Sequence, residues 1–224
     1  MELRYAVFDL DMTLIDSIVP LMTSANLLAR EFGLPEVTRE AVLAAEKSAP
    51  SVTFESFWQT LWGRYDPAWY EVYRDRLADR EYEVMTLYPG GRETLEALLA
   101  RGVGLGLASN RDLPGRALAA LNLTPLFGAV VGQKDVARPK PAPDMLLRAM
   151  ELLGAGPEET VYVGDSKGDI ACAAAAGVKS FAMITGGHDR AELAALGAWR
   201  VGENLAEVLD VFPLIPGFDE TTSE

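Results

Sequence analysis

Two aspartates lie two positions apart, directly after the first apolar run of the chain. Asp9 and Asp11 follow the strand-like residues 5–8, and side chains two apart near a strand end face the same general direction. Carboxylates this close repel each other unless a cation lies between them or one of them is protonated. A divalent cation at Asp9 and a general acid at Asp11 would use both properties. The pattern alone is a weak signal, because aspartate is common in loops.

A serine–asparagine pair and a lysine flanked by prolines offer groups that bind anions. Ser109 and Asn110 follow the apolar run 103–108 and present a hydroxyl, an amide and backbone N–H groups. Lys140 stands between two prolines that stiffen its backbone. Each pattern also has an ordinary structural interpretation, as a turn or N-cap pair and as a loop that precedes a helix.

Two further carboxylates follow the apolar run 161–164. Asp165 and Asp169 are four residues apart, so both can face one cation if Asp169 lies in the first turn of a helix. They could also be simple helix-start residues. Ligands of open parallel sheets bind at the carboxyl ends of the strands. All four polar segments could therefore meet in one crevice and hold one phosphoryl group.

Short apolar strands alternate with helical periodicity after residue 87. The expected helices lie near residues 92–101, 113–121, 143–153 and 168–176, and the expected strands at 103–108, 128–132, 160–163 and 179–184. This alternation is typical of βαβ units. We predict an α/β fold with a Rossmann-like, doubly wound parallel sheet that also includes the first strand, over residues 5–10.

Residues 16–86 show helical periodicity without a strand signal. The first helix is expected to end at Gly33, and the expected helix starts are Ser17 as an N-cap, Thr38, Thr53 and the Asp66-Pro67 pair. The pattern predicts a catalytic core over residues 1–15 and 87–224 and a helical cap domain over residues 16–86 that determines substrate specificity.

The position and composition of this insertion suggest a lid. It contains Trp58, Trp62 and Trp69, most of which we expect to pack within the insertion. Because the insertion begins directly after the aspartate loop, we expect it to close over the carboxylates and exclude water.

Charge and hydropathy exclude several classes of protein. The chain has 224 residues, is 49% hydrophobic and carries a formal charge of −13, so it can bury a core but lacks the basic face that nucleic-acid binding requires. A phosphorylated substrate must be attracted by local cations. No apolar run approaches the roughly 20 residues of a membrane helix. The N-terminal residues show no signal-peptide pattern, so we expect a cytoplasmic protein.

The remaining motifs exclude zinc and common nucleotide sites. One histidine and one cysteine cannot form the usual zinc site, whereas carboxylates suit Mg2+. Cys172 is expected to be a buried helix residue. Gly102, Gly104 and Gly106 lie within a strand instead of a turn, so they are no dinucleotide motif, and no Gly-x-x-x-x-Gly-Lys loop occurs.

The four segments together resemble the motifs of the haloacid dehalogenase-like superfamily, in its phosphatase branch with a helical cap of the C1 type. Residues 9–17, Asp-Leu-Asp-Met-Thr-Leu-Ile-Asp-Ser, are similar to the opening motif of phosphoglycolate phosphatase-like members. Residues 140–144 and 164–170 are equally typical, and the resemblance covers essentially the whole chain. Met12 departs from it, because the family usually has glycine there; if the position requires a positive φ, methionine would be strained.

The resemblance implies a mechanism that begins at the first motif. Asp9 would be the nucleophile that forms an aspartyl-phosphate, and Asp11 would be the general acid and base. Mg2+ would be held by the carboxylates of Asp9 and Asp165 and the main-chain carbonyl of Asp11, while Asp169 would orient this shell.

The other motif residues would bind the phosphoryl group. Ser109, the N–H of Asn110 and Lys140 would hold its oxygens, and Arg111 could reach the substrate from the core. Thr13 would fix the loop and help to place Asp11. The implied activity is Mg2+-dependent hydrolysis of a small phosphorylated metabolite by a monomer or a homodimer.

Several alternatives share these residues. Asp11 argues against a dehalogenase or a phosphonatase, because in the family pattern these enzymes lack the second aspartate of the first motif. A phosphosugar mutase of the β-phosphoglucomutase type and a pyrophosphatase remain open, as does a phosphate-binding or regulatory module without catalysis. A receiver domain is disfavoured, because it carries its phosphoacceptor on a middle strand.

Substrate identity is left open by the sequence. Phosphoglycolate, pyrophosphate, sugar phosphates and nucleoside monophosphates all fit. The polar candidates in the cap are Lys47, Ser51, Thr53 and Arg64. Of these, Lys47 and Arg64 are better explained as solvated helix residues. His188 is expected at the rim or in a capping role, and the acidic tail over residues 218–224 is expected to be frayed.

Overall fold

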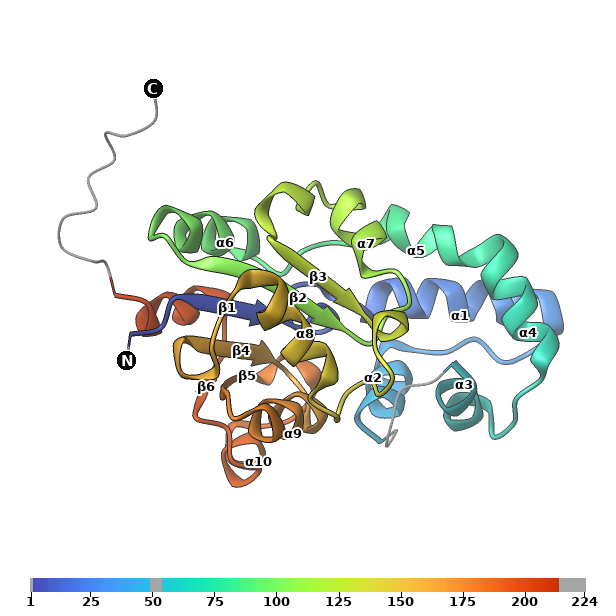
Figure 1. The fold of residues 1–224 in the computed structure, drawn as a ribbon. Helices are drawn as coiled ribbons and strands as arrows, with labels where there is room; N and C mark the ends of the chain where they lie inside the picture. Colours follow the sequence, from blue (N-terminus) through green and yellow to red (C-terminus); the bar gives the residue numbers. More distant parts are fainter. Residues whose placement is uncertain (1, 49–53, 214–224) are drawn as a thin grey trace.

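A six-stranded parallel sheet forms the centre of the molecule (Figure 1). The computed structural model describes residues 2–48 and 54–213. The strand order is β3-β2-β1-β4-β5-β6, which is the doubly wound order that places a ligand crevice at the carboxyl ends of the central strands. The strands are β1 (Tyr5–Phe8), β2 (Gly104–Ser109), β3 (Ala129–Gly132), β4 (Thr160–Gly164), β5 (Lys179–Met183) and β6 (Arg200–Gly202). The predicted α/β fold is confirmed.

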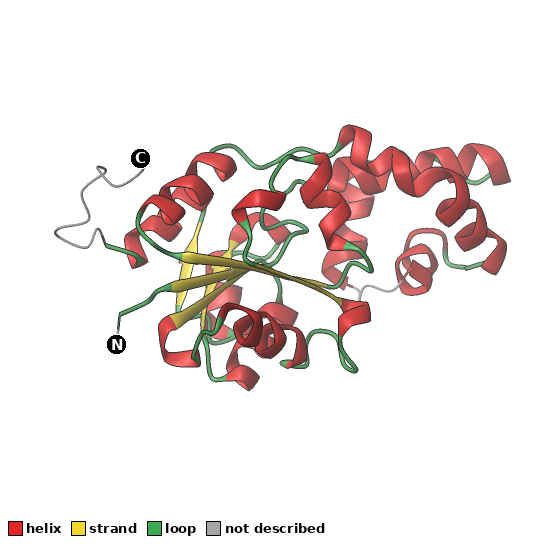
Figure 2. Ribbon diagram, turned by 45° about the horizontal axis from the view of Figure 1, so that its top comes forward, coloured by secondary structure: helices red, strands yellow, loops and turns green. Residues whose placement is uncertain are grey.

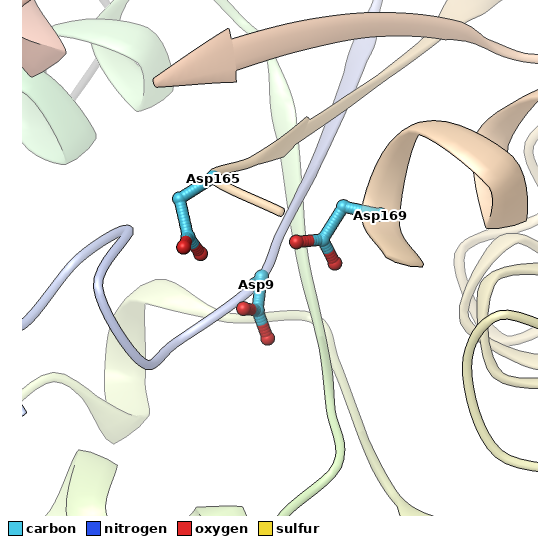
Figure 3. A group of neighbouring side chains, drawn as sticks. All are labelled: Asp9, Asp165 and Asp169. Carbon is cyan, nitrogen blue, oxygen red and sulfur yellow. The ribbon is translucent and has the colours of Figure 1, made fainter. Parts of the chain in front are cut away.

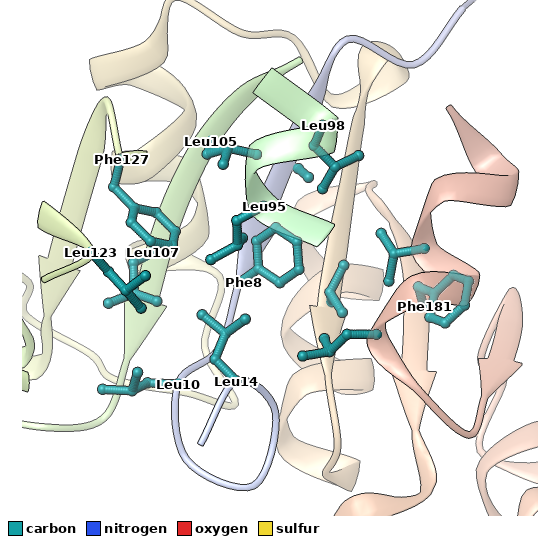
Figure 4. Packing of buried hydrophobic residues seen from close by; sticks show 14 of the residues in the cluster. Phe8, Leu10, Leu14, Leu95, Leu98, Leu105, Leu107, Leu123, Phe127 and Phe181 are labelled. Carbon is teal, nitrogen blue, oxygen red and sulfur yellow. The ribbon is translucent and has the colours of Figure 1, made fainter. Parts of the chain in front are cut away.

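Helices cover both faces of this sheet (Figure 2). They are α6 (Gly91–Ala100), α7 (Pro114–Ala120), α8 (Asp144–Leu153), α9 (Lys167–Ala176) and α10 (Arg190–Ala195). Short 3-10 helices are η2 (Thr124–Leu126), η3 (Gln133–Asp135), η4 (Pro157–Glu159), η5 (Ile184–Gly186) and η6 (Leu205–Val211). Successive side chains of β1 point to opposite faces. Phe8 packs with Leu95 and Leu107 (Figure 4), and Val7 packs with Met145 in a second cluster.

The helical insertion lies beyond the carboxyl ends of the strands (Figure 1). Its elements are α1 (Ile18–Phe32), α2 (Arg39–Ser48), α3 (Phe54–Trp62), α4 (Pro67–Val72), the π-helix η1 (Tyr73–Leu77) and α5 (Ala78–Val84). It has its own apolar cluster, in which the rings of Trp58 and Trp62 stack with centroids 4.9 Å apart. Trp69 meets Trp62 edge to face at 5.3 Å. Burial of these aromatic rings holds the helices together.

Two of the expected helix starts are confirmed and one is corrected, while the start expected at Thr53 lies outside the described residues. Asp66 caps α4, because its side chain accepts a hydrogen bond from Ala68 N at 2.9 Å. Thr38 accepts one from Ala41 N at 3.3 Å. Ser17 occupies the N-cap position of α1 but its side chain does not cap the helix. The carboxylate of Asp16 accepts the hydrogen bond from Ile18 N at 3.1 Å instead. Ser17 has φ −79° and ψ −7°, which are helical angles, whereas a residue that caps with its side chain is usually extended.

Some expectations fall outside the described residues. These are the roles of Ser51 and Thr53 in the cap and the frayed tail over residues 218–224. Cys172 is buried in α9, as expected. None of the helices within residues 2–48 and 54–213 has both the length and the apolar character needed to cross a bilayer.

Met12 connects the sheet to the helical insertion. Its φ is 56°, so the position does require the left-handed conformation that a side chain disfavours. The side chain is 4% exposed and belongs to the apolar cluster of the insertion. Its backbone carbonyl accepts a hydrogen bond from the hydroxyl of Thr185. Packing of the methionine against the insertion therefore offsets the strain of its backbone.

We predict that Met12→Gly destabilises the protein although it removes this strain. Relief of the left-handed conformation is worth about 1–2 kcal/mol, whereas loss of a buried methionine side chain costs about 2–5 kcal/mol. Urea-induced unfolding should show a net loss of roughly 1–3 kcal/mol. Met12→Leu keeps the strain and most of the apolar volume, and it should stay within about 1.5 kcal/mol of the parent. A glycine variant as stable as the parent would contradict the assignment.

Candidate active site

Three buried carboxylates meet at the carboxyl ends of β1 and β4 (Figure 3). Asp9 follows β1, Asp165 follows β4, and Asp169 lies in the first turn of α9. Each offers a carboxylate oxygen, and these oxygens all lie within 4.8 Å of one another. The site therefore occupies the crevice where the strand order reverses, as the sheet topology dictates.

Lys140 enters this group from the loop before α8. Its Nζ lies 2.6 Å from Asp9 Oδ1 and 2.7 Å from Asp169 Oδ1. Burial would lower the pKa of the Lys140 ammonium, but the charges of Asp169 and Asp9 raise it above its usual value. The lysine is thus held in its charged form, and one ammonium faces three carboxylates.

The imbalance appears in the pKa values of the carboxylates. Burial, opposed by Lys140 and reinforced by Asp169 and Asp11, raises the pKa of Asp9 to about 7. Burial and the charges of Asp169 and Asp9 raise the pKa of Asp165 well above its usual range. Such shifts mean that the site is short of positive charge. A divalent cation bound by oxygen ligands would correct this shortage.

Asp169 differs from the other two because its oxygens are already occupied. Ser166 donates from its N–H to Asp169 Oδ2 at 3.0 Å, and Asp169 N–H donates to Ser166 Oγ at 3.2 Å, which together form the capping box of α9. The Ser166 hydroxyl also lies 2.6 Å from Asp169 Oδ2. The other oxygen, Asp169 Oδ1, accepts hydrogen bonds from Tyr162 Oη at 3.1 Å and from Lys140 Nζ. Burial would raise the pKa of Asp169, but Lys140 and Ser166 hold it below the usual value. Asp169 therefore acts as the anchor of Lys140.

Ser109 and Asn110 lie beside this group at the end of β2. Ser109 is fully buried, and its Oγ accepts a hydrogen bond from Arg111 N at 3.2 Å. Asn110 Oδ1 accepts one from Lys140 N at 3.2 Å. The structure thus brings the second and third sequence segments together, with the amide of Asn110 fixing the backbone of Lys140.

Asp11 lies outside the group of three carboxylates and pairs with Arg111. Arg111 donates from Nε to Asp11 Oδ2 at 2.8 Å and from Nη2 to Oδ1 at 2.6 Å, a bidentate geometry that fixes the orientation of both groups. Thr13 was expected to help place Asp11, but its hydroxyl donates to Asp165 Oδ1 at 3.1 Å. That hydrogen bond links the first segment directly to the last.

Other candidates from the sequence lie elsewhere. His188 Nδ1 is 3.4 Å from Glu192 Oε2, next to the N-cap of α10 at Asp189. The guanidinium of Arg64 lies 5.6 Å from the centroid of the Trp69 ring, which is a structural contact within the insertion. The side chain of Lys47 is not among the described parts of α2.

Sequence reasoning missed Gly186, which closes over Asp165. A Cβ at Gly186 would lie 2.8 Å from Asp165 Cγ and closer still to its Oδ2. Only glycine lets the backbone of η5 pass this close to the carboxylate. The signal available in the sequence was a glycine pair shortly after a strand, at Gly186 and Gly187.

Comparison with known proteins agrees with this geometry. Residues 6–183 match the family model described as haloacid dehalogenase-like hydrolase. A phosphoglycolate phosphatase of Escherichia coli is 33% identical over 83% of this chain and 82% of its own length. One from Chromobacterium violaceum is 32% identical over 94% of this chain and 96% of its own. The fold also matches the crystal structure of a predicted phosphoglycolate phosphatase from Haemophilus somnus, with a TM-score of 0.80 and 23% identity over 95% and 99% of the two chains.

The chain belongs to the haloacid dehalogenase-like hydrolases. The resemblance found in the motifs is confirmed, as is the inference that the protein is an enzyme of this family.

We predict that Gly186→Ala impairs cation binding at the three carboxylates. The added methyl group overlaps Asp165 and must displace either its carboxylate or the η5 backbone. Thermal unfolding with and without Mg2+ should show a stabilisation by the cation that is much smaller than in the parent. The control is Gly115→Ala, since a Cβ at Gly115 meets no atom within 4 Å. An undiminished response to Mg2+ in Gly186→Ala would contradict the close approach.

Proposed function

We propose that the protein is a Mg2+-dependent phosphatase that hydrolyses a small phosphorylated metabolite, a phosphomonoester like phosphoglycolate, through an aspartyl-phosphate on Asp9. The observation that carries the proposal is the buried Asp9 carboxylate, 2.6 Å from Lys140 and grouped with two further carboxylates at the sheet edge. The named activity of the Escherichia coli and Chromobacterium violaceum relatives supports the choice of substrate class.

The chemistry of the donor set fits Mg2+. It consists of oxygen atoms, which this cation prefers. Burial and neighbouring carboxylates raise the pKa values of Asp9 and Asp165, so a cation beside them would favour their charged forms. The carboxylates of Asp9 and Asp165 and the main-chain carbonyl of Asp11 would hold the ion, and Asp169 would support the shell through Lys140. When bound, Mg2+ offsets the repulsion between a carboxylate and a phosphate dianion and stabilises charge on the transferring group.

Asp9 acts as the nucleophile, and Asp11 transfers a proton in each of the two chemical steps. A carboxylate oxygen of Asp9 forms a bond to phosphorus while the bond from phosphorus to the leaving oxygen breaks. Asp11 gives its proton to that oxygen, so an alcohol departs. Asp11 then takes a proton from water, whose oxygen attacks phosphorus and releases phosphate and the Asp9 carboxylate.

Ser109, the N–H of Asn110 and Lys140 would bind the phosphoryl oxygens. Their positions are preset, because Ser109 and Lys140 are buried and Asn110 is hydrogen-bonded to the Lys140 backbone. Preset donors need little reorganisation as charge shifts in the transition state. Arg111, next in the chain, would contact the rest of the substrate.

Residues 16–86 would serve as the cap domain over a core formed by residues 1–15 and 87–224. The separate apolar cluster of the insertion supports this division. Its helix α2 reaches the site at η5, where Leu43 lies against Gly187, since a Cβ at that glycine would be 3.3 Å from Leu43 Cδ1. The cap would exclude water and select the substrate.

Replacing the nucleophile tests the mechanism. Asp9→Asn should lower turnover by a factor on the order of 10³ or more, because the amide oxygen is a poor nucleophile. The fold should be retained, since burial already disfavours the charge of Asp9. Phosphate release with Mg2+ is measured from p-nitrophenyl phosphate and from phosphoglycolate, pyrophosphate, sugar phosphates and nucleoside monophosphates. Full activity of Asp9→Asn would refute the nucleophile assignment.

Binding of Mg2+ should strengthen as the pH rises toward neutrality. Without the cation the pKa of Asp9 is raised to about 7 by burial, so the group is protonated at pH values well below that. Mg2+ needs the carboxylate, and its binding must release the proton. Calorimetry should show affinity that increases with pH by roughly tenfold per pH unit for each proton released, with Asp9 and Asp165 both contributing because the pKa of each is raised.

The control for this titration is Asp165→Asn, which removes one proposed ligand and should abolish most of the binding. Affinity that is constant between acidic and neutral pH would count against Asp9 as a ligand.

A further inference from the structure

Glu81 is a buried carboxylate that the proposed reaction does not use. It lies on α5 and is 2% exposed. It is the only charged residue of the insertion that is buried, among those whose side chains are described. Burial of a carboxylate is costly unless it is paired and hydrogen-bonded. Its partners therefore indicate why it is there.

Both oxygens of Glu81 have partners. Tyr73 donates its hydroxyl to Glu81 Oε1 at 2.8 Å, and Arg111 Nη1 lies 3.4 Å from Glu81 Oε2. The phenol comes from η1 and the guanidinium from the segment after β2. Glu81 is thus held from within the insertion and contacts the core through one arginine.

Arg111 is clamped between two carboxylates. Its Nε and Nη2 hold Asp11, and its Nη1 faces Glu81. A guanidinium is planar and its donors form a rigid fork, so a partner on Nη1 limits rotation of the edge that holds Asp11. The orientation of the Asp11 carboxylate is therefore coupled to Glu81, although the two do not touch.

We propose that Glu81 is a positioning residue of the reaction, which acts through Arg111 to set the Asp11 carboxylate, with Tyr73 holding Glu81 in place. This inference rests on the role of Asp11 as general acid and base under the proposed function. The insertion would then contribute to the proton-transfer steps as well as covering the site.

The alternative explanation is that the ion pair between Glu81 and Arg111 only stabilises the contact between the insertion and the core. The structure offers a control for this alternative. Asp79 Oδ1 lies 2.6 Å from Arg116 Nη2, so a second ion pair joins the same helix α5 to α7. Both side chains of this pair are exposed, and neither contacts Arg111 or Asp11. Asp79→Asn therefore removes a tie of the same kind without disturbing the clamp.

The kinetic test compares Glu81→Gln with Asp79→Asn on phosphoglycolate with Mg2+, because its leaving group is an alcohol that needs a proton, whereas p-nitrophenolate departs without one. Glu81 contacts none of the residues proposed to hold the phosphoryl oxygens, and its partner Arg111 keeps its charge in the variant, so KM should change by less than kcat. General acid–base catalysis contributes about 10²–10⁴ in rate, and partial misplacement of Asp11 should lower kcat by about tenfold. Asp79→Asn should leave both constants unchanged.

Tyr73→Phe tests the series of contacts from Tyr73 through Glu81 and Arg111 to Asp11 at the end that lies in the insertion. It should lower kcat less than Glu81→Gln does, and it should add nothing when combined with Glu81→Gln, because the phenol acts through the carboxylate. Should Glu81→Gln not fold, Tyr73→Phe alone carries the comparison with Asp79→Asn.

A nitrogen NMR signal gives a readout that needs no turnover. The Nε–H resonance of Arg111, assigned by its loss in Arg111→Lys, should shift or broaden in Glu81→Gln and stay unchanged in Asp79→Asn. An unchanged kcat and Arg111 signal in Glu81→Gln would overturn the proposal, as would equal losses of kcat in Glu81→Gln and Asp79→Asn. If the parent enzyme releases no phosphate, the proposed function fails, and the NMR comparison still decides whether Glu81 sets Arg111.

Discussion

Three carboxylates share one buried ammonium at the edge of the sheet, and much of the surrounding structure serves to keep them there. Like charges in a low-dielectric space repel strongly, yet Asp9 and Asp169 both lie within 2.7 Å of Lys140 Nζ. The arrangement is held by the hydrogen-bonded sheet, since the parallel strands β1 and β4 are neighbours and end together. Close approaches by glycine complete it: Gly186 faces Asp165, and a Cβ at Gly164 would clash with the Asp169 side chain.

The lysine is the residue on which this group depends. A lysine side chain is long and flexible unless several contacts fix its ammonium group. Asp169 accepts one hydrogen bond from it, Asn110 accepts another from its backbone, and Ser166 locks Asp169 by the capping box. The consequence is a cation whose position is set before a phosphate arrives. Positioning of this kind is what lets an electrostatic contact favour the transition state.

The sequence predicted the fold well, because the strands are apolar runs with polar ends and helices between them. It missed β6, a three-residue edge strand with exposed Arg200, since nothing distinguishes such a segment from a loop. Residue types and strand ends also suggested which side chains would gather at the crevice. Pairing within the crevice could not be foreseen: Thr13 contacts Asp165, and Glu81 reaches Arg111 across thirty positions of sequence. The first contact depends on the course of the loop after β1 and the second on how the insertion folds back, and local sequence patterns encode neither.

Under the proposed function, the charges of the site would impose an order on substrate binding. The cationic side chains Lys140 and Arg111 are both engaged in this structure, Lys140 by Asp9 and Asp169 and Arg111 by Asp11 and Glu81. A chain with a formal charge of −13 offers a phosphate dianion no long-range attraction. Adding a dianion to a crevice that already holds excess carboxylate is unfavourable until positive charge enters. Under the proposed function, a divalent cation would therefore have to bind before the phosphorylated substrate or together with it, so that Lys140 could share its charge with the phosphate.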